Sequence, residues 1–506
     1  MAATTTSPCA PTTTQVGGVE LNGLNCIHES ERTGRPAGLF WPWFAANVSV
    51  LGVSYGSFLL GFEISFWQAT SVAVIGIVMS YLFCGFISLA GKRGSAPTLT
   101  LSRAAFGVYG NRLPSSVAWL VTVGWETVLV ALAVLAIATV FGELGLGGGV
   151  LTKVLALVVV VMLVIGGGIY GFASIMRMQV VITVITGILT LIYIVLVFDH
   201  IDLAAAAAMP GGDIQHLIGG LVFMMTGFGL GWVQAAADYS RYLPRSSSSS
   251  AVVGWTTFGS SLAPVILVIF GLLLAASSTE LNRRIGADPI GALTTILPVW
   301  FLVPFAIVAV LGLIGGAVLD IYSSGIALLS SGVDIPRPVA AAIDGVIMVI
   351  GAVYIVFFAQ SFIAPFQAFL ITLGTPIAAW CGIFLADMSL RRQDYVDADL
   401  FDGKGRYGRV NTLAVIVLVV ATGLGWGLIT NPIADAPWLD WLGYLLEAFG
   451  LGGRRGVWAH ANLGVLVALA AGYAGIMVFG RGAVRRQELQ PHIAGQTRNG
   501  GSHPEA

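Results

Sequence analysis

Two carboxylates lie inside long apolar stretches of the sequence. Asp320 lies within the apolar run 301–331, and Glu126 lies within the run 115–141. A carboxylate in the hydrocarbon of a bilayer is unfavourable by several kcal/mol unless it is paired or neutralised. We therefore expect each residue to bind a cation, carry a proton or accept a hydrogen bond from a bound solute. For Glu126 a structural hydrogen bond or salt bridge to a neighbouring helix is the alternative.

Hydroxyl side chains follow Asp320 at a spacing that suits a cation site. Ser323 and Ser324 come within about one helical turn of Asp320, so the three side chains can converge on one face. Hard cations such as Na⁺ prefer oxygen ligands of this kind. Asp320, Ser323 and Ser324 are therefore a candidate Na⁺ site. The four cysteines form no CxxC pair that would indicate another metal site.

Trp125 directly precedes Glu126, near the middle of the run 115–141. Tryptophan in membrane proteins is usually found at the interfaces, so its depth here favours a role in a site. An indole face can stack on a flat heterocycle. Asp238 and Arg241 lie one turn apart at the end of the run 215–237, and we expect them to form a structural or gating pair.

The segments that carry these residues require lipid as their solvent. The chain has 506 residues, of which 57% are hydrophobic and only 10% are charged, whereas a soluble protein has about 25% charged residues. The net charge of −1 argues against a nucleic-acid surface. The polar segment 1–40 lacks the apolar core of a signal peptide and is expected to be a cytoplasmic tail.

Apolar runs that approach the roughly 20 residues of a spanning helix recur along the whole chain. They predict an all-α polytopic membrane protein of about twelve transmembrane helices. The predicted spans are 41–63, 67–90, 115–141, 151–170, 178–198, 215–237, 252–277, 301–331, 338–358, 362–388, 410–430 and 458–480.

The distribution of basic residues predicts the orientation. With both tails, 1–40 and 481–506, on the cytoplasmic side, most of the 24 Lys and Arg residues fall in cytoplasmic segments. Those in outer loops are Lys153, Arg283, Arg284, Arg454 and Arg455. The low Lys content and the abundance of Gly, Ala and Val suggest a bacterial cytoplasmic membrane.

Glycines interrupt the first and sixth predicted helices. The first contains LGVSYGS at 51–57, and the sixth contains TGFGLGW at 226–232. An unwound backbone is tolerated in a membrane only where it lines a cavity or is buried in protein. Breaks at matching positions of the two blocks 41–198 and 215–388 predict a transporter site built from inverted repeats. Close helix packing on these glycines is the alternative.

Five short motifs stand out along the chain: FWPWFAANVS at 40–49, GSAP at 94–97 with SRAAFG at 102–107, DYSRYLP at 238–244, ADPI at 287–290 and GKGRYG at 403–408. Together and in this order they resemble the nucleobase–cation symporter family, in its purine–cytosine permease branch. The resemblance spans roughly 35–480. It implies a leucine-transporter-like fold of two inverted five-helix repeats, 41–198 and 215–388, with two peripheral helices within 410–480.

The same resemblance implies a secondary active transporter rather than an enzyme. It would import a nucleobase, cytosine or a purine, by alternating access with Na⁺ or H⁺. Allantoin, hydantoin and pyridoxine are alternative solutes. No cofactor is expected beyond the coupling ion. The expected partners are the solute, the cation and the bilayer, without nucleic acid, and the chain is expected to be a monomer.

Four aromatic or acidic positions gain a candidate role from the resemblance. Trp125 matches the family's stacking tryptophan. Phe228 stands where the family has a second aromatic residue, and Trp232, one turn away, competes with it. Asp320 replaces an asparagine that is common in the family, which leaves open whether it binds sodium, a proton or the amino edge of a base.

The resemblance also implies partners for the cation on the first helix. Ser323 and Ser324 match hydroxyl residues that help to hold sodium against backbone carbonyls of that helix. In this sequence those carbonyls would lie near Gly52 and Tyr55. Ser54, between them, would offer its hydroxyl to the solute.

Overall fold

The computed structural model describes residues 26–169, 172–333, 335, 337–431 and 437–490. All regular structure in these ranges is helical, which confirms the predicted all-α class. The ends of both predicted tails, 1–25 and 491–506, lie outside the described residues.

Eight segments in the described ranges are long and apolar enough to cross a bilayer by themselves. They contain α3 (Phe66–Arg93), α6 (Arg112–Glu143), α7 (Val150–Ile169), α10 (Ile214–Gly227) with α11 (Gly229–Trp232) and η4 (Val233–Ala235), α12 (Ser249–Ser277), α15 (Val299–Ser330), α16 (Arg337–Phe357) and α17 (Ile363–Leu390).

The other four predicted spans coincide with bent or shorter helices. The first contains α1 (Phe40–Asn47) and α2 (Leu51–Leu60), which meet at 66°. The last contains α19 (Gly464–Phe479), which bends by 57° into α20 (Arg481–Leu489). Shorter apolar helices lie in α8 (Phe172–Leu196) and in α18 (Thr412–Trp426). Each of the predicted runs thus holds an apolar helix.

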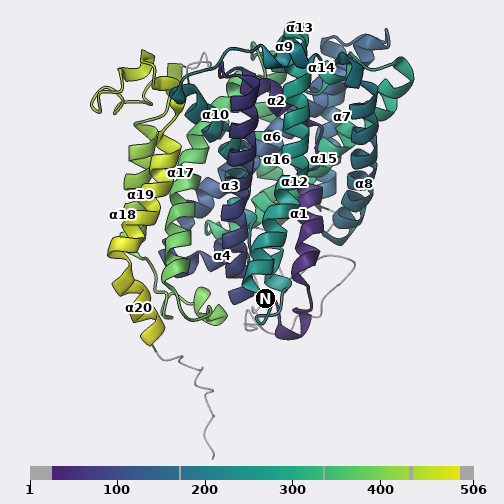
Figure 1. Ribbon diagram of the computed structural model, residues 1–506. Helices are drawn as coiled ribbons and strands as arrows, with labels where there is room; N and C mark the ends of the chain where they lie inside the picture. Colours follow the sequence, from purple (N-terminus) through teal and green to yellow (C-terminus); the bar gives the residue numbers. More distant parts are fainter. Residues whose placement is uncertain (1–25, 170–171, 334, 336, 432–436, 491–506) are drawn as a thin grey trace, which may run out of the picture.

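Short helices connect the spans. They are η1 (Glu29–Glu31), η2 (Pro36–Leu39), α4 (Thr98–Leu101), α5 (Arg103–Phe106), η3 (Phe198–His200), α9 (Leu203–Ala207), η5 (Ser240–Tyr242), α13 (Thr279–Ala287), α14 (Gly291–Thr294), η6 (Asp397–Leu400), η7 (Pro437–Leu439), η8 (Gly453–Arg455) and η9 (Ala459–Ala461). Figure 1 places α4 and α20 toward one end of the bundle and α9, α13 and α14 at the other. We call them the α20 end and the α13 end.

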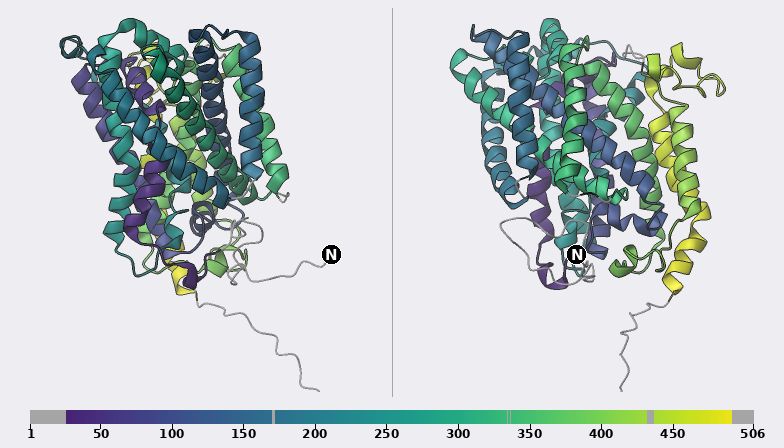
Figure 2. Two further views of the ribbon diagram at one scale, coloured as in Figure 1. Left: turned by 90° about the vertical axis from the view of Figure 1, so that its right-hand side faces the viewer. Right: turned by 180° about the vertical axis from the view of Figure 1, so that it is seen from behind.

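The long helices pack in two groups with a third pair beside them (Figures 1 and 2). In one group α3 packs on α10 and α12, and α2 packs on α12. In the other group α6 packs on α15 and α16. The last pair, α18 and α19, lies against α17 on one side of the bundle. The broken helices therefore belong to one group and the helix of Trp125 and Glu126 to the other.

The first helix breaks earlier than the glycine pattern predicts. The break comprises 48–50, whereas 51–57 is helical and buried in α2. A Cβ atom on Gly56 would collide with the backbone nitrogen of Leu272 on α12. The prediction that 51–57 is unwound is therefore wrong, and close packing explains these glycines.

An asparagine stabilises the end of α1 where the break begins. The Asn47 Nδ2 atom donates a hydrogen bond to the Trp43 carbonyl at 2.8 Å. Its Oδ1 atom accepts a hydrogen bond from the Tyr81 hydroxyl on α3. The side chain thus satisfies a carbonyl of the helix end and ties that end to its neighbour.

The sixth helix breaks within the predicted segment. The helix α10 ends at Gly227, and Phe228 has φ −120° and ψ −107°, outside the helical region. The backbone N–H of Gly229 donates to the Ser80 hydroxyl at 3.1 Å. A Cβ atom on Gly229 would collide with the backbone of α3 at Ser80. Glycine at this position therefore permits the close approach that holds the break.

Candidate functional site

A cavity lies where the two broken helices face α6, α8 and α15. It has a volume of about 150 Å³ for the centres of water-sized molecules. Residues 45–52 around the first break line it, as do Gly227 and Phe228 at the second. It extends to Pro97 and Asp238 toward the α20 end. This central cavity is the candidate site.

Aromatic side chains form much of the cavity wall. Tyr55, Trp125, Phe228 and Trp232 all line it, so the structure brings the predicted aromatic residues together. The Phe228 ring lies 4.5 Å from the Tyr55 ring between centroids and is only 6% exposed. Trp125 and Trp232 are only partly buried. These two indoles therefore offer more surface to a solute than Phe228 does.

A glycine allows Trp125 to reach across the cavity. A Cβ atom on Gly231 would lie 3.2 Å from the indole Nε1 atom of Trp125. On its other edge the indole packs against Phe366, with ring centroids 5.7 Å apart. The ring thus spans from α6 to α11 and α17, and a bulkier residue at Gly231 would displace it.

Asp320 also faces the central cavity. It lines the cavity and is 9% exposed. Among the described residues it has neither a hydrogen bond nor an ion pair. Ser323 lines the same cavity, as do Gly52 and Tyr55 of the first helix. Four of the five predicted cation ligands therefore surround one space.

Ser324 and Glu126 lie behind the cavity wall. The Ser324 hydroxyl lies 2.7 Å from the Asp344 Oδ2 atom, and the indole Nε1 of Trp119 donates to Asp344 Oδ1 at 2.7 Å. Glu126 is fully buried near Ser324. Neither of its carboxyl oxygens has a hydrogen-bond partner in the described part of the chain. These side chains form a polar cluster of α6, α15 and α16, and direct contact with a cavity solute is not supported for Glu126 or Ser324.

The Ser54 side chain also points away from the central cavity. Its hydroxyl donates to the Pro289 carbonyl at 2.6 Å, and its side chain is fully buried. It does not line the central cavity. The bond joins α2 to the loop between α13 and α14, so this geometry gives no support to a solute contact by Ser54.

Asp238 fixes the α20 end of the sixth span. Its Oδ1 atom accepts hydrogen bonds from the backbone N–H and the hydroxyl of Thr98, at 2.8 and 2.7 Å. Arg241 is buried, with its guanidinium 5.2 Å from the centre of the Tyr242 ring. The gating role of Asp238 and Arg241 stays a prediction.

Gln234 is a cavity residue that the sequence reasoning missed. Its Nε2 atom donates to the Gly231 carbonyl at 2.6 Å. Its Oε1 atom is buried without a hydrogen-bond partner among the described residues, and the side chain lines the cavity. The sequence signal that could have identified Gln234 is an uncharged amide side chain within the apolar run 215–237.

A layer of aromatic rings closes the cavity toward the α13 end. Phe366 of α17 lies 5.8 Å from Tyr55, 6.1 Å from Phe58 and 6.5 Å from Phe223, between ring centroids. Tyr55 lines the central cavity, whereas Phe58 and Phe223 line a second cavity on the α13 side. We call Tyr55, Phe58, Phe223, Phe228 and Phe366 the aromatic layer.

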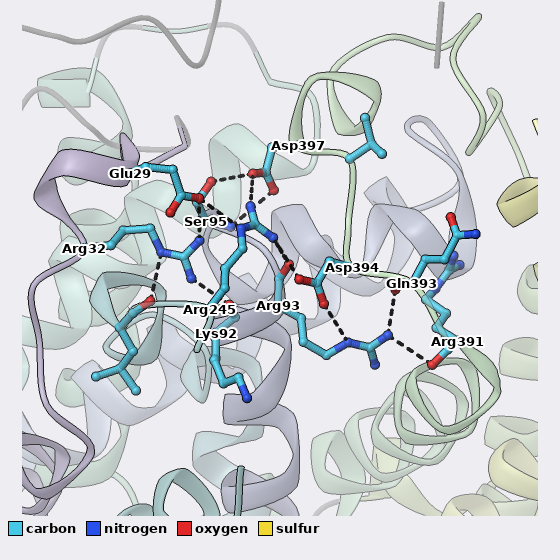
Figure 3. A network of polar contacts seen from close by, with 12 residues as sticks. Glu29, Arg32, Lys92, Arg93, Ser95, Arg245, Arg391, Gln393, Asp394 and Asp397 are labelled. Carbon is cyan, nitrogen blue, oxygen red and sulfur yellow. Dashed lines mark hydrogen bonds and ion pairs between the residues drawn. The ribbon is translucent and has the colours of Figure 1, made fainter. Parts of the chain in front are cut away.

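Charged side chains connect the loops at the α20 end (Figure 3). Arg245 bonds Glu29 at 2.9 Å and Asp397 at 3.0 Å. Arg32 bonds Glu29 at 3.0 Å, and Arg93 lies 3.5 Å from Asp394. We call these residues the charged network: Glu29, Arg32, Arg93, Arg245, Asp394 and Asp397.

The charged network lowers the pKa of Glu29, one of its three acids. Burial raises the pKa of Glu29, but the hydrogen bond from Arg245 and the charges of Arg32 and Arg245 outweigh it. The pKa of this carboxyl is therefore held below its ordinary value. The network thus joins the N-terminal segment to the loops after α3, η5 and α17 as ionised pairs at neutral pH.

The fold matches that of a solved transporter. The chain resembles Mhp1, described as a nucleobase-cation-symport-1 family transporter, in a closed conformation with bromovinylhydantoin bound. The TM-score is 0.67 at 18% identity, over 92% of this chain and 99% of Mhp1. The inward-facing conformation of Mhp1 gives a TM-score of 0.69 at 17% identity, over 93% and 94% of the two chains. The leucine-transporter-like fold is thereby confirmed.

Sequence comparison agrees with this fold. A protein of Bacillus subtilis (strain 168) named as a purine-cytosine permease, YxlA, is 23% identical over 448 residues. The match covers 86% of this chain and 92% of that protein. The family model described as "Permease for cytosine/purines, uracil, thiamine, allantoin" matches residues 26–441. The chain therefore belongs to this permease family.

Proposed function

We propose that the protein imports a nucleobase, cytosine or a purine, by symport with Na⁺ or H⁺. As a member of a permease family, the chain is a membrane transporter and not an enzyme. The observation that carries the proposal is that Trp125, Asp320 and Gln234 face one cavity between the broken helices.

The cavity wall suits a flat solute with N–H groups on its edge. Trp125 and Trp232 supply aromatic faces, and stacking of a base on such a face contributes about 1–3 kcal/mol. The Gln234 Oε1 atom is a buried acceptor without a partner in the described chain, and the Asp320 carboxyl is a second acceptor in the wall of the same cavity. Ring N–H or exocyclic amino groups would satisfy them, and a solute without such donors would leave them unpaired.

The coupling cation is proposed to bind at the same wall. Asp320 and Ser323 offer side-chain oxygens, and the unwound segment 48–50 beside them offers backbone carbonyls. The carbonyls of Gly52 and Tyr55 lie within the helix α2. Oxygen donors of this kind fit Na⁺. A carboxylate that faces a membrane cavity can instead carry a proton. Ser324 supports the cation only indirectly, since its hydroxyl lies against Asp344.

The α20 end is proposed to face the cytoplasm of the cell membrane, with both termini there and the chain a monomer. The α20 end carries Lys92 and Arg93 in the last turn of α3 and Arg245 and Arg392 in loops, whereas the segments predicted to lie outside carry Lys153, Arg283, Arg284, Arg454 and Arg455. The positive-inside rule then puts the α20 end inside. The aromatic layer would close the cavity toward the outside.

Uptake of radiolabelled cytosine, adenine, hypoxanthine, uracil and allantoin tests this proposal in cells without their own permeases. We expect saturable uptake of a base, dependent on a Na⁺ or H⁺ gradient and abolished by Trp125→Ala. Loss of Na⁺ dependence in Asp320→Asn would place the cation at this carboxyl. Uptake of allantoin alone would replace the nucleobase by another heterocycle. No uptake of any of the five by protein in the membrane contradicts the proposal.

A further inference from the structure

A second cavity lies beyond the aromatic layer, between α2, α10, α13, α17 and η9. Its volume is about 280 Å³ for the centres of water-sized molecules. Polar side chains from distant parts of the sequence line it: Glu63, His216, Asn282, Gln367, His460 and Asn462. The predicted transport function does not use this group of residues.

Gln367 points to a ligand in this cavity. It lines the cavity, and only 7% of its surface is exposed. No hydrogen bond from another described residue reaches its amide. An amide both donates and accepts hydrogen bonds. Its position in the wall therefore suits a ligand with both kinds of group.

The backbone around the cavity is also unusual. Glu63 has φ 55° and Asn462 has φ 49°, and they are the non-glycine residues with positive φ in the described ranges. Both line this cavity. Asn462 is held there because its Oδ1 atom accepts from the Thr430 N–H at 2.9 Å. Residues kept in such conformations cluster at functional sites.

Aromatic and imidazole rings define the shape of the ligand. Phe62 and Phe223 lie 5.6 Å apart between centroids on the side of the aromatic layer. His216 and His460 lie 6.3 Å apart, with their rings at 88° to each other. Flat apolar faces beside imidazole and amide groups fit a planar ring with polar edges.

We propose that this cavity is a second binding site, which a neutral planar heterocycle of the transported class occupies before the aromatic layer opens. The inference rests on the proposed function, since it takes its ligand class from there. Phe58 and Phe223 line this site and pack toward Tyr55 of the central cavity, at 5.8 and 5.7 Å between centroids. A single layer of rings thus separates the two sites.

Cysteine protection tests the second site in the purified full-length chain. Gly286 lines this cavity, and a Cβ atom there would meet nothing within 4 Å, so Gly286→Cys is a suitable reporter. Arg283→Cys is the matched control, because this side chain on the same helix is 73% exposed. The reaction with a charged thiol reagent is timed with and without saturating cytosine, adenine, uracil or allantoin. Of the four native cysteines, Cys84 and Cys381 are buried, and Cys9 and Cys26 are replaced by serine in every variant.

We expect one of these heterocycles to slow labelling of Gly286→Cys at least about fivefold and to leave Arg283→Cys unchanged. Protection should persist when Trp125→Ala is added and disappear when Gln367→Leu is added. Absence of protection overturns the second site. It is also overturned if protection disappears when Trp125→Ala is added but persists when Gln367→Leu is added. Uptake by the wild-type chain distinguishes failure of the second-site inference from failure of the proposed function. If the wild-type chain takes up a solute but shows no protection, only the second site is contradicted. If it takes up no solute, the proposed function is contradicted as well.

Discussion

The two ends of the central cavity are bounded by opposite kinds of interaction. Toward the α13 end the aromatic layer packs rings from α2, α10 and α17, with Tyr55 and Phe228 4.5 Å apart between centroids. Toward the α20 end the charged network joins loops through directed ion pairs (Figure 3). The ring packing involves no charged groups, whereas each ion pair fixes two particular loops.

This difference indicates which contacts can separate during transport. These rings can part without leaving unpaired charges, because their contacts are apolar apart from the hydrogen bond that the Tyr55 hydroxyl donates to the Gly227 carbonyl at 3.1 Å. Ion pairs at the edge of the bundle are partly solvated and individually weak. Their value lies in fixing the N-terminal segment and the loop 391–397 relative to α3. We therefore expect the aromatic layer to open and the charged network to hold the α20 end together.

The largest effect on stability is expected at a buried ion pair of the α20 end, the one pair in the described ranges with both side chains buried. Asp387 and Arg391 lie 2.6 Å apart, with side chains 4% and 3% exposed. Asp387→Ala would leave Arg391 uncompensated, and we expect about 3–5 kcal/mol of destabilisation. Thermal unfolding in detergent measures it. Arg392→Ala, at the exposed neighbour, should change the melting temperature little, and equal shifts would contradict this account.

A large effect is also expected when the aromatic layer is opened. Phe366→Ala removes the ring that touches Tyr55, Phe58 and Phe223. A cysteine at Gly312 reports access from the α13 end, because Gly312 lines the central cavity and a Cβ atom there would lie 3.8 Å from the nearest neighbouring atom. We expect an impermeant thiol reagent outside intact cells to label it about tenfold faster.

Phe384→Ala is the control for that measurement. Phe384 is a fully buried ring on the same helix, but it packs on Trp380 away from the layer. It should leave the labelling of Gly312→Cys unchanged. If both variants accelerate labelling equally, general loosening of α17 is responsible and the layer is not the closure.

A smaller effect is expected in the charged network. Arg245→Ala removes the contacts to Glu29 and Asp397, but the arginine side chain is 30% exposed. Solvent screening limits the loss to about 1 kcal/mol. We expect a melting temperature a few degrees lower and an uptake rate that changes less than in Phe366→Ala. Arg35→Ala, at an exposed arginine nearby, is the matched control.

The smallest effect concerns pH. The pKa of Glu29 is held below its usual value of 4.5, so its contribution to stability is complete above about pH 4.5 and is lost as the pH falls through the lower pKa of the folded state. Glu29→Gln should lower the melting temperature slightly at pH 7, and the difference should vanish well below pH 4. A difference that grows on acidification would have the wrong sign.

The helical architecture was predictable because lipid imposes it. Apolar runs fix the spans, and each run holds an apolar helix where the structure describes it. The glycines of 226–232 correctly marked the second break because Gly229 contacts α3. The glycines of 51–57 did not mark the first break, since Gly56 serves packing on α12. Glycine alone does not distinguish a break from a close helix contact.

Part of the site was predictable because some residue types are rare inside a membrane helix, and part because the family resemblance or the helical spacing pointed to Phe228, Trp232 and Ser323, which also line the cavity. Asp320 and Trp125 could be selected on the first ground, and both line the cavity. Ser324 and Ser54 could not be placed, because one position of helical rotation decides whether a hydroxyl faces the cavity or a neighbouring helix. Gln234 was missed because an uncharged amide in an apolar run is a weaker signal than a carboxylate, and its role depends on the Gly231 carbonyl beside it.

Equilibrium binding of the transported base to purified protein tests the central claim, that Trp125 forms the stacking wall of the solute site. We predict that Trp125→Ala weakens binding by about 5- to 150-fold, the equivalent of about 1–3 kcal/mol, and that Trp125→Phe recovers part of the loss. Trp255→Ala, at a partly exposed indole on α12 away from the cavity, should leave the affinity unchanged. Unchanged affinity in Trp125→Ala would contradict the account.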